Sequence, residues 1–304
     1  MAKDATYGKL DAAPDSLDPG IEEAGAFPEI ELPFAFPMGA RHSVACVASG
    51  SGHRADKLGN MPDYAAAVLA IGRLLAPDGN TAALPPGLRW RRDALGKPFT
   101  EWTGALAEWA RVQGLESRHL HVSNTHDGGA HIVIAAYSAE LAGIGIDLVW
   151  LPRLRTPGKD RRYLLRFARQ FMSAEELAAF ESTLDDPFLL SHLAVHSPCP
   201  PLPGPEEALI LRTAAHFSLM EAASKACGTG LKIGVGMGRH TSLPKQSLGA
   251  LRLFPEVELA FGPEARQRLE EIGAARYEAF VSAGPEMLVS VVALYRPHPK
   301  PHSR

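Results

Sequence analysis

The 304-residue sequence lacks the features that mark several classes of protein. Its only cysteines, Cys46, Cys199 and Cys227, lie far apart and form no CxxC pair, so the sequence indicates neither a disulfide framework nor a zinc knuckle. No apolar run reaches the roughly 18 residues of a membrane span. The N-terminus carries Lys3 and Asp4 where a signal peptide would need an unbroken apolar stretch. We expect a cytoplasmic protein that does not enter a membrane.

An excess of basic charge is also missing. The sequence has 31 Lys and Arg against 34 Asp and Glu, a net charge of -3, which gives no indication of nucleic-acid binding. Apolar residues make up 46% and charged residues 21%, as in an ordinary globular protein. The length allows one large domain or two smaller packed units.

Residues 1–38 differ in composition from the rest of the chain. They are rich in Asp, Glu, Pro and Ala, and Lys3 and Lys9 are their only basic residues. Such a segment can bury little apolar surface, so we expect a flexible acidic arm.

The remainder alternates between strand and helix patterns. Period-two patterns predict strands over 41–49, 119–124, 131–137, 143–151, 248–254, 256–261, 276–282 and 288–295, and residues 87–99 mix strand and turn signals. Helical spacing predicts helices over 62–76, 101–114, 161–171, 173–182 and 214–227, and a short helix begun by Pro263. Five prolines in 196–207 predict a loop. With hairpins outnumbering crossovers, the pattern indicates an α+β fold.

Asp147 stands in the predicted strand GIGIDLVWL. The pleat puts Ile144 and Ile146 on one face and Gly145 and Asp147 on the other, so we expect the carboxylate to leave the packed face. The glycines at 143 and 145 would allow a backbone or a ligand to approach the strand closely. A solvated side chain or a turn partner is the alternative interpretation of Asp147.

Glu221 and Lys225 are four residues apart in a predicted helix and therefore share one face. A surface ion pair is one interpretation. However, the helix is apolar almost all round, and burying an unpaired charge is costly. A metal ion for the carboxylate and a phosphate for the ammonium would serve both groups.

Five sequence blocks resemble, in order, those of the 4'-phosphopantetheinyl transferase superfamily. Three of the blocks are GIGIDLVWLPRL, RFARQFMSAEELAAF and FSLMEAASKACGTGL. The sequence around Asp147 is most similar to the short holo-acyl-carrier-protein synthase type. Upstream, GKP (96–98) and VSNTHDGG (122–129) resemble blocks of the longer, surfactin-type branch. The resemblance covers roughly residues 87–235. Five blocks in the correct order are a strong joint signal.

The resemblance implies an enzyme that transfers 4'-phosphopantetheine from coenzyme A to a serine of an acyl, polyketide or peptidyl carrier protein and releases 3',5'-ADP. It also implies two similar α/β halves packed as a pseudo-dimer, each with a small, mostly antiparallel sheet, in a monomeric protein. We place the halves at 39–140 and 141–296, with coenzyme A in the cleft between them.

The resemblance also assigns roles to individual residues. Asp147 and Glu221 would hold Mg²⁺ or Mn²⁺, hard cations suited to carboxylates and pyrophosphate oxygens. Lys225 would neutralise the pyrophosphate. Lys97, Thr125 and His126 would hold the 3'-phosphoadenosine end of coenzyme A. Glu221, Lys225 and Asp147 are the expected catalytic residues, with Glu221 the candidate acceptor of the serine proton.

The sequence departs from the family pattern at three positions. Met220 replaces the lysine that usually precedes the glutamate, and Val149 and Trp150 stand where the two branches carry a second acidic residue. These departures leave two alternatives open. One is a non-catalytic relative that binds carrier protein or coenzyme A, and the other is a different metal-dependent nucleotide phosphotransferase.

The segment from Arg153 to Arg169 holds seven basic residues and one acid, Asp160. A solvated basic face is one interpretation. Because the segment follows the strand of Asp147 and carriers of the resembled family are usually acidic, a docking surface for the carrier is the other.

Overall fold

The computed structural model describes residues 38, 40–48, 61–76, 85–93, 97–156, 160–172, 205–229, 248–252 and 258–297, with four single positions between 174 and 181. The predicted acidic arm lies outside the described residues except for its last position. So do most of the helix predicted over 173–182 and the first nine residues of the predicted proline-rich loop.

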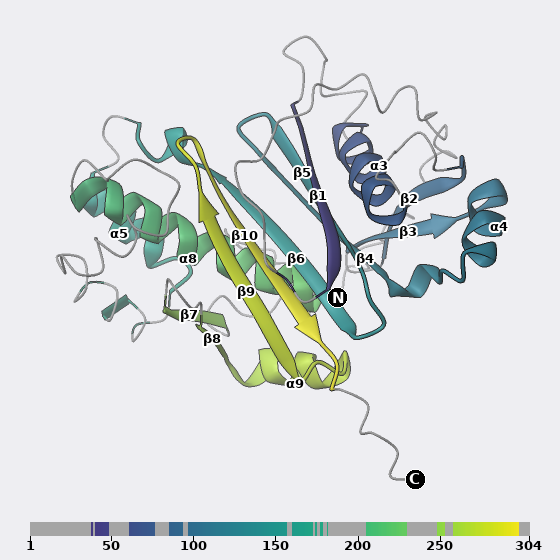
Figure 1. The fold of residues 1–304 in the computed structure, drawn as a ribbon. Coiled ribbons are helices and arrows are strands. Elements are labelled where there is room, and N and C mark those ends of the chain that lie inside the picture. Colours follow the sequence, from purple (N-terminus) through teal and green to yellow (C-terminus); the bar gives the residue numbers. More distant parts are fainter. Residues whose placement is uncertain are drawn as a thin grey trace, which may run out of the picture.

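The first part of the chain forms a three-stranded antiparallel sheet covered by a helix. The strands β1 (Arg41–Ala48), β5 (Ala130–Tyr137) and β4 (Leu120–Asp127) lie in the order β1-β5-β4. The helix α3 (Met61–Leu75) lies against β1 and β5 (Figure 1). Its apolar face, with Ile71 and Leu74 fully buried, packs on Val133 and Ala135 of β5. These elements confirm the predicted strands and helix.

A hairpin precedes β4. It consists of β2 (Leu88–Arg92) and β3 (Pro98–Trp102), and α4 (Gly104–Val112) and a short 3-10 helix (Ser117–His119) follow it. The helix predicted from residue 101 begins three residues later, because Glu101 and Trp102 pair with Arg89 and Leu88 in the hairpin.

The second part of the chain repeats the arrangement of a three-stranded antiparallel sheet and a helix. The sheet has the order β6-β10-β9, with β6 (Leu141–Trp150), β10 (Met287–Tyr295) and β9 (Arg276–Ala283). The long helix α8 (Pro205–Cys227) lies against β6 and β10. Around them are a 3-10 turn (Leu151–Arg153), α5 (Arg161–Ala168), α9 (Pro263–Glu271) and the hairpin of β7 (Leu248–Arg252) and β8 (Glu258–Phe261).

The helix α8 begins earlier than the sequence predicts. The loop prediction over 196–207 is wrong at its end, since α8 starts at Pro205 and adds nine residues to the predicted helix. Proline is accepted at the start of a helix, where its missing N–H has no partner to lose. The added turns put Leu209, Ile210 and Leu211 into the core.

The strand β6 is buried on both faces. Ile144, Ile146 and Leu148 belong to one core cluster, while α8 covers the other face. The prediction that the Asp147 carboxylate leaves the packed face is therefore wrong, since Asp147 is only 4% exposed. The period-two pattern assigns Asp147 to the correct face of the strand. It does not show that a helix covers this face.

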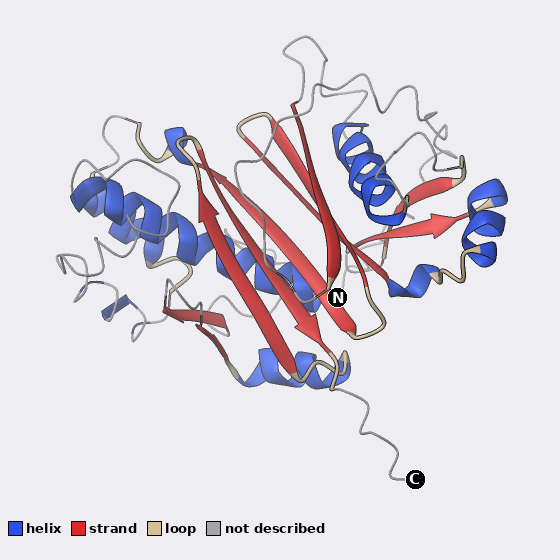
Figure 2. Cartoon of the chain, in the orientation of Figure 1, coloured by secondary structure: helices blue, strands red, loops and turns tan. Residues whose placement is uncertain are grey.

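The predicted α+β class is confirmed. The fold consists of small antiparallel sheets with helices packed against them, as Figure 2 shows. The domain boundaries at residues 38 and 140 and the pseudo-dimeric symmetry stay predictions. Among the described residues, no helix is long and apolar enough to cross a membrane.

Candidate active site

The two three-stranded sheets meet where β4 runs beside β6, and side chains of β4 join them. The backbone N–H of Ile146 donates to Ser123 Oγ over 3.1 Å, and the N–H of Trp150 donates to Asp127 Oδ2 over 2.8 Å. These bonds satisfy backbone donors of a buried strand, which would be costly to leave unpaired. They also fix the position of Asp147 relative to β4.

The helix α8 approaches β6 very closely at two glycines. A Cβ at position 145 would lie 1.8 Å from the carbonyl oxygen of Ala222, and one at Gly143 would lie 2.1 Å from that of Ala226. Only glycine fits such an approach. The prediction that a backbone comes close to these glycines is thereby confirmed, and the closeness brings Glu221 and Lys225 over Asp147.

Asp147 is held at both its backbone and its side chain. Ser218 Oγ of α8 donates to the carbonyl oxygen of Asp147 over 3.1 Å. The side-chain atom Oδ1 accepts from Thr125 Oγ1 at 3.0 Å and from Lys225 Nζ at 2.8 Å. Lys225 Nζ also donates to the carbonyl oxygen of Ile146 over 3.1 Å. The carboxylate thus joins β4, β6 and α8.

Two carboxylate oxygens at this point are buried without a hydrogen-bond partner among the described residues. They are Asp147 Oδ2 and Glu221 Oε2. The pKa of Glu221 is raised to about 7, chiefly by burial; Lys225 partly opposes this rise, and nearby Asp147 adds to it. Buried acceptors without a partner are costly. They fit a hard divalent cation, which takes oxygen ligands and keeps waters in its remaining positions.

A cavity of about 450 Å³ opens beside these groups. All six residues predicted for the site line it, namely Lys97, Thr125, His126, Asp147, Glu221 and Lys225. Arg92 also lines the cavity, as do Arg153 and Asp127, which form an ion pair of 3.1 Å. The cavity therefore combines a carboxylate pair with several cations, a suitable environment for an anionic ligand that carries a metal ion.

Lys97 reaches from the hairpin β2–β3 across to the second sheet. Its Nζ lies 3.6 Å from where a Cβ of Gly143 would be. Burial lowers the pKa of Lys97, and Asp93 and Cys227 partly oppose this effect. A buried ammonium of this kind gains from an anionic partner.

Residues 143–271 match the family model of the 4'-phosphopantetheinyl transferase superfamily. This segment is a 4'-phosphopantetheinyl transferase superfamily domain. A search of the curated proteins finds no match.

Solved structures of holo-[acyl-carrier-protein] synthases are among the similar ones. That of Neisseria meningitidis is 24% identical, covers 51% of this chain and 98% of its own, and gives a TM-score of 0.32. That of Helicobacter pylori in complex with coenzyme A is 18% identical over 50% of this chain and 98% of its own, with a TM-score of 0.32. The synthase of Plasmodium yoelii is 14% identical over 52% of this chain and 97% of its own, with a TM-score of 0.35.

The phosphopantetheinyl transferase domain contains Asp147, Glu221 and Lys225, whereas Lys97, Thr125 and His126 precede it. The departures Met220 and Val149 lie inside the domain, and both side chains are buried in its core cluster. Neither of them lines the cavity.

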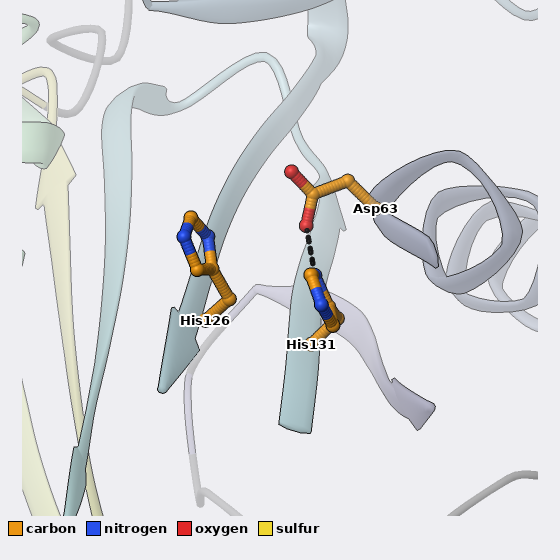
Figure 3. Close-up of side chains that lie close together, drawn as sticks. All are labelled: Asp63, His126 and His131. Atoms are coloured by element: carbon orange, nitrogen blue, oxygen red, sulfur yellow. Dashed lines mark hydrogen bonds and ion pairs between the residues drawn. The ribbon is translucent and has the colours of Figure 1, made fainter. Parts of the chain in front are cut away.

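Sequence reasoning missed a second group of polar residues beside the domain. Asp63 of α3 and His131 of β5 lie next to His126, as Figure 3 shows. No motif spacing connects them, because they come from separate elements. Ser123 and Asp127, which join β4 to β6, were also missed, although both stand in the block VSNTHDGG.

Proposed function

We propose that this protein transfers 4'-phosphopantetheine from coenzyme A to a serine of a carrier protein, with Mg²⁺ held by Asp147 and Glu221. The proposal rests on two buried oxygens, Asp147 Oδ2 and Glu221 Oε2, that have no hydrogen-bond partner among the described residues. Both residues line the cavity, as does Lys225. The superfamily match of residues 143–271 supports the same chemistry.

In the proposed reaction, the serine oxygen attacks the β-phosphorus of coenzyme A. The P–O bond to the leaving 3',5'-ADP breaks, and the serine loses its proton. A bound Mg²⁺ would neutralise charge on the pyrophosphate. Catalysis of this kind depends on positioning and on fixed charges rather than on covalent participation of the protein.

The residues of the cavity have distinct proposed roles. Lys225, fixed by its contact with Asp147, stabilises negative charge on the pyrophosphate. Lys97, Thr125 and His126 bind the 3'-phosphoadenosine end. Glu221, directly or through a metal-bound water, is the candidate acceptor for the serine proton.

We place the docking surface for the carrier on α5 and the turn before it. Arg161 and Arg162 are exposed at the start of α5, and Asp160 caps the helix by accepting from the N–H of Tyr163. Arg153, in the preceding turn, lines the cavity. Basic residues on α5 and at the cavity would attract an acidic carrier and raise its association rate.

Incubation with coenzyme A, Mg²⁺ and a panel of apo carrier proteins tests the proposal. Intact-mass spectrometry should show a carrier that gains one phosphopantetheine arm, and a carrier with its modified serine changed to alanine should gain none. If coenzyme A and carrier bind but no carrier gains mass, the protein is a non-catalytic relative. If phosphoryl groups reach other acceptors instead, it is a different phosphotransferase.

A further inference from the structure

Three side chains with metal-binding atoms converge at the rim of the cavity, apart from the carboxylate pair. Asp63 comes from α3, His126 from β4 and His131 from β5, and one ligand atom from each lies within 4.8 Å of the others (Figure 3). The two histidines are directly opposite each other in the register of β4 and β5. Their rings are stacked, with centroids 5.2 Å apart and an interplanar angle of 18°.

The carboxylate of this cluster is firmly oriented. Asp63 is only 3% exposed, and its Oδ1 lies 3.0 Å from His131 Nδ1. Its other oxygen, Oδ2, accepts from Asn124 Nδ2 over 2.7 Å. A hydrogen bond to the second oxygen is the kind of support that metal-binding carboxylates usually have. His126, in contrast, is exposed and lines the cavity, so its ring is free to adjust.

We propose that Asp63, His126 and His131 form a binding site for a transition-metal ion of the Zn²⁺ class. Imidazole nitrogens suit Zn²⁺, Ni²⁺ and Cu²⁺, whereas Mg²⁺ prefers oxygen ligands and water. Two histidines and one carboxylate are a common protein ligand set for Zn²⁺ with one coordination position left open. His126 is the member of this set that lines the cavity, so Zn²⁺ and the 3'-phosphoadenosine end of coenzyme A would compete for its ring.

The distances fit this ion after a small adjustment. With bonds of about 2.0–2.1 Å, ligand atoms around a tetrahedral Zn²⁺ are roughly 3.3 Å apart. Asp63 Oδ1 and His131 Nδ1 are already 3.0 Å apart. The exposed His126 ring therefore makes most of the remaining movement. A bound Zn²⁺ would replace the hydrogen bond between His131 Nδ1 and Asp63 Oδ1.

The two candidate metal sites should differ in their preferred ion. The pair Asp147 and Glu221 offers only oxygen ligands, whereas the cluster at Asp63 offers two nitrogens. Excess Mg²⁺ should therefore fill the first site and leave the second open to Zn²⁺. This difference allows the histidine cluster to be tested without reference to the proposed transfer reaction.

The test is calorimetric titration of the chelator-treated full-length protein with Zn²⁺ in millimolar Mg²⁺. The parent should bind Zn²⁺ with a site that His126→Ala and His131→Ala each weaken at least about tenfold, the lower range for loss of even an indirect metal contact. His119→Ala, which removes a half-buried histidine outside the cluster, should bind like the parent. Co²⁺ should give visible absorption bands of a tetrahedral nitrogen and oxygen site in the parent and lose them in both cluster variants.

Circular dichroism establishes that each variant is folded, and the exposed His126 offers the variant least able to disturb the fold. Equal Zn²⁺ affinity and stoichiometry in the parent, His126→Ala and His131→Ala would overturn the proposal. So would a parent that binds no Zn²⁺ at micromolar concentration.

Discussion

Lys225 and Asp147 form an ion pair between α8 and β6, with Nζ 2.8 Å from Oδ1. The pair leaves Asp147 Oδ2 without a hydrogen-bond partner among the described residues and holds the ammonium at the wall of the cavity. Lys225 thus contacts Asp147 on one side while its charge remains available to an anion. The closest approach of α8 to β6, at Gly145, makes this geometry possible.

Lys225→Ala should weaken coenzyme A binding roughly tenfold to a hundredfold and slow transfer, because a charge-assisted hydrogen bond contributes about 1.5–3 kcal/mol. Lys97→Ala should mainly weaken binding. Lys225→Arg, which keeps the charge, is the matched control and should retain more affinity than the alanine variant. Calorimetric titration with coenzyme A measures these effects, and unchanged affinity in both alanine variants would remove the two lysines from the site.

Gly145→Ala should disturb the site without touching any of its polar residues. The added methyl group would meet the Ala222 carbonyl oxygen at 1.8 Å, so α8 must move away from β6. Overpacking of this kind costs about 1–3 kcal/mol or more. We expect a lower free energy of unfolding in urea and reduced transfer in the fraction that folds. A variant as stable and as active as the parent would show that α8 does not need this close approach.

His121 should make stability depend on pH. Burial lowers its pKa from 6.5 to about 4, and the charges of Lys97 and Arg296 contribute to the decrease. The unfolded chain therefore takes up a proton below pH 6.5, while the folded protein does so only near pH 4. Stability that is present above pH 6.5 is lost as the pH falls toward 4, by up to about 3 kcal/mol from this group.

Urea unfolding of the parent and of His121→Leu between pH 7 and pH 4 isolates this contribution, because all other groups titrate in both. The difference in unfolding free energy between the two should change in favour of the variant as the pH falls. A constant difference across this range would mean that the histidine titrates equally in the folded and unfolded states.

Arg161 and Arg162 test the docking surface. Reversal of both to Glu should raise the KM for the carrier and flatten its salt dependence between about 50 and 300 mM, where screening changes strongly. Coenzyme A affinity should stay nearly unchanged. The control is reversal of Arg111, in α4, and Arg118, in the 3-10 helix that follows it. It makes the same change in charge at the other end of the molecule from α5 (Figure 1). If both double variants show the same carrier kinetics, the carrier docks elsewhere.

The relative placement of Asp147, Glu221 and Lys225 could be predicted from the sequence because that information is local. The pleat of β6 assigns Asp147 to the face of Gly145, and the helical repeat puts Glu221 and Lys225 together. The motif blocks then associate these residues with Lys97 and His126. The start of α8 at Pro205 could not be read, since proline indicates a loop and a helix start equally well.

The cluster of Asp63, His126 and His131 shows what local patterns leave out. The two histidines meet only because β4 and β5 pair in one register, and Asp63 reaches them only because α3 packs on this sheet. Neither the strand pairing nor the helix packing produces a periodic pattern in the sequence. Nor could the sequence show that Asp147 Oδ2 has no hydrogen-bond partner in the described part of the chain, because this depends on how α8 covers the strand.

The proposed binding of the metal ion by Asp147 and Glu221 can be tested by replacing either residue. The most direct measurement is intact-mass analysis of a responsive apo carrier, incubated with coenzyme A and Mg²⁺ and with the parent, Asp147→Ala or Glu221→Ala. Circular dichroism serves as the check on folding. We expect the parent to add the phosphopantetheine arm, and both variants to be folded, to bind Mg²⁺ more weakly and to add none. Near-parent turnover by either folded variant would contradict the assignment of the metal site.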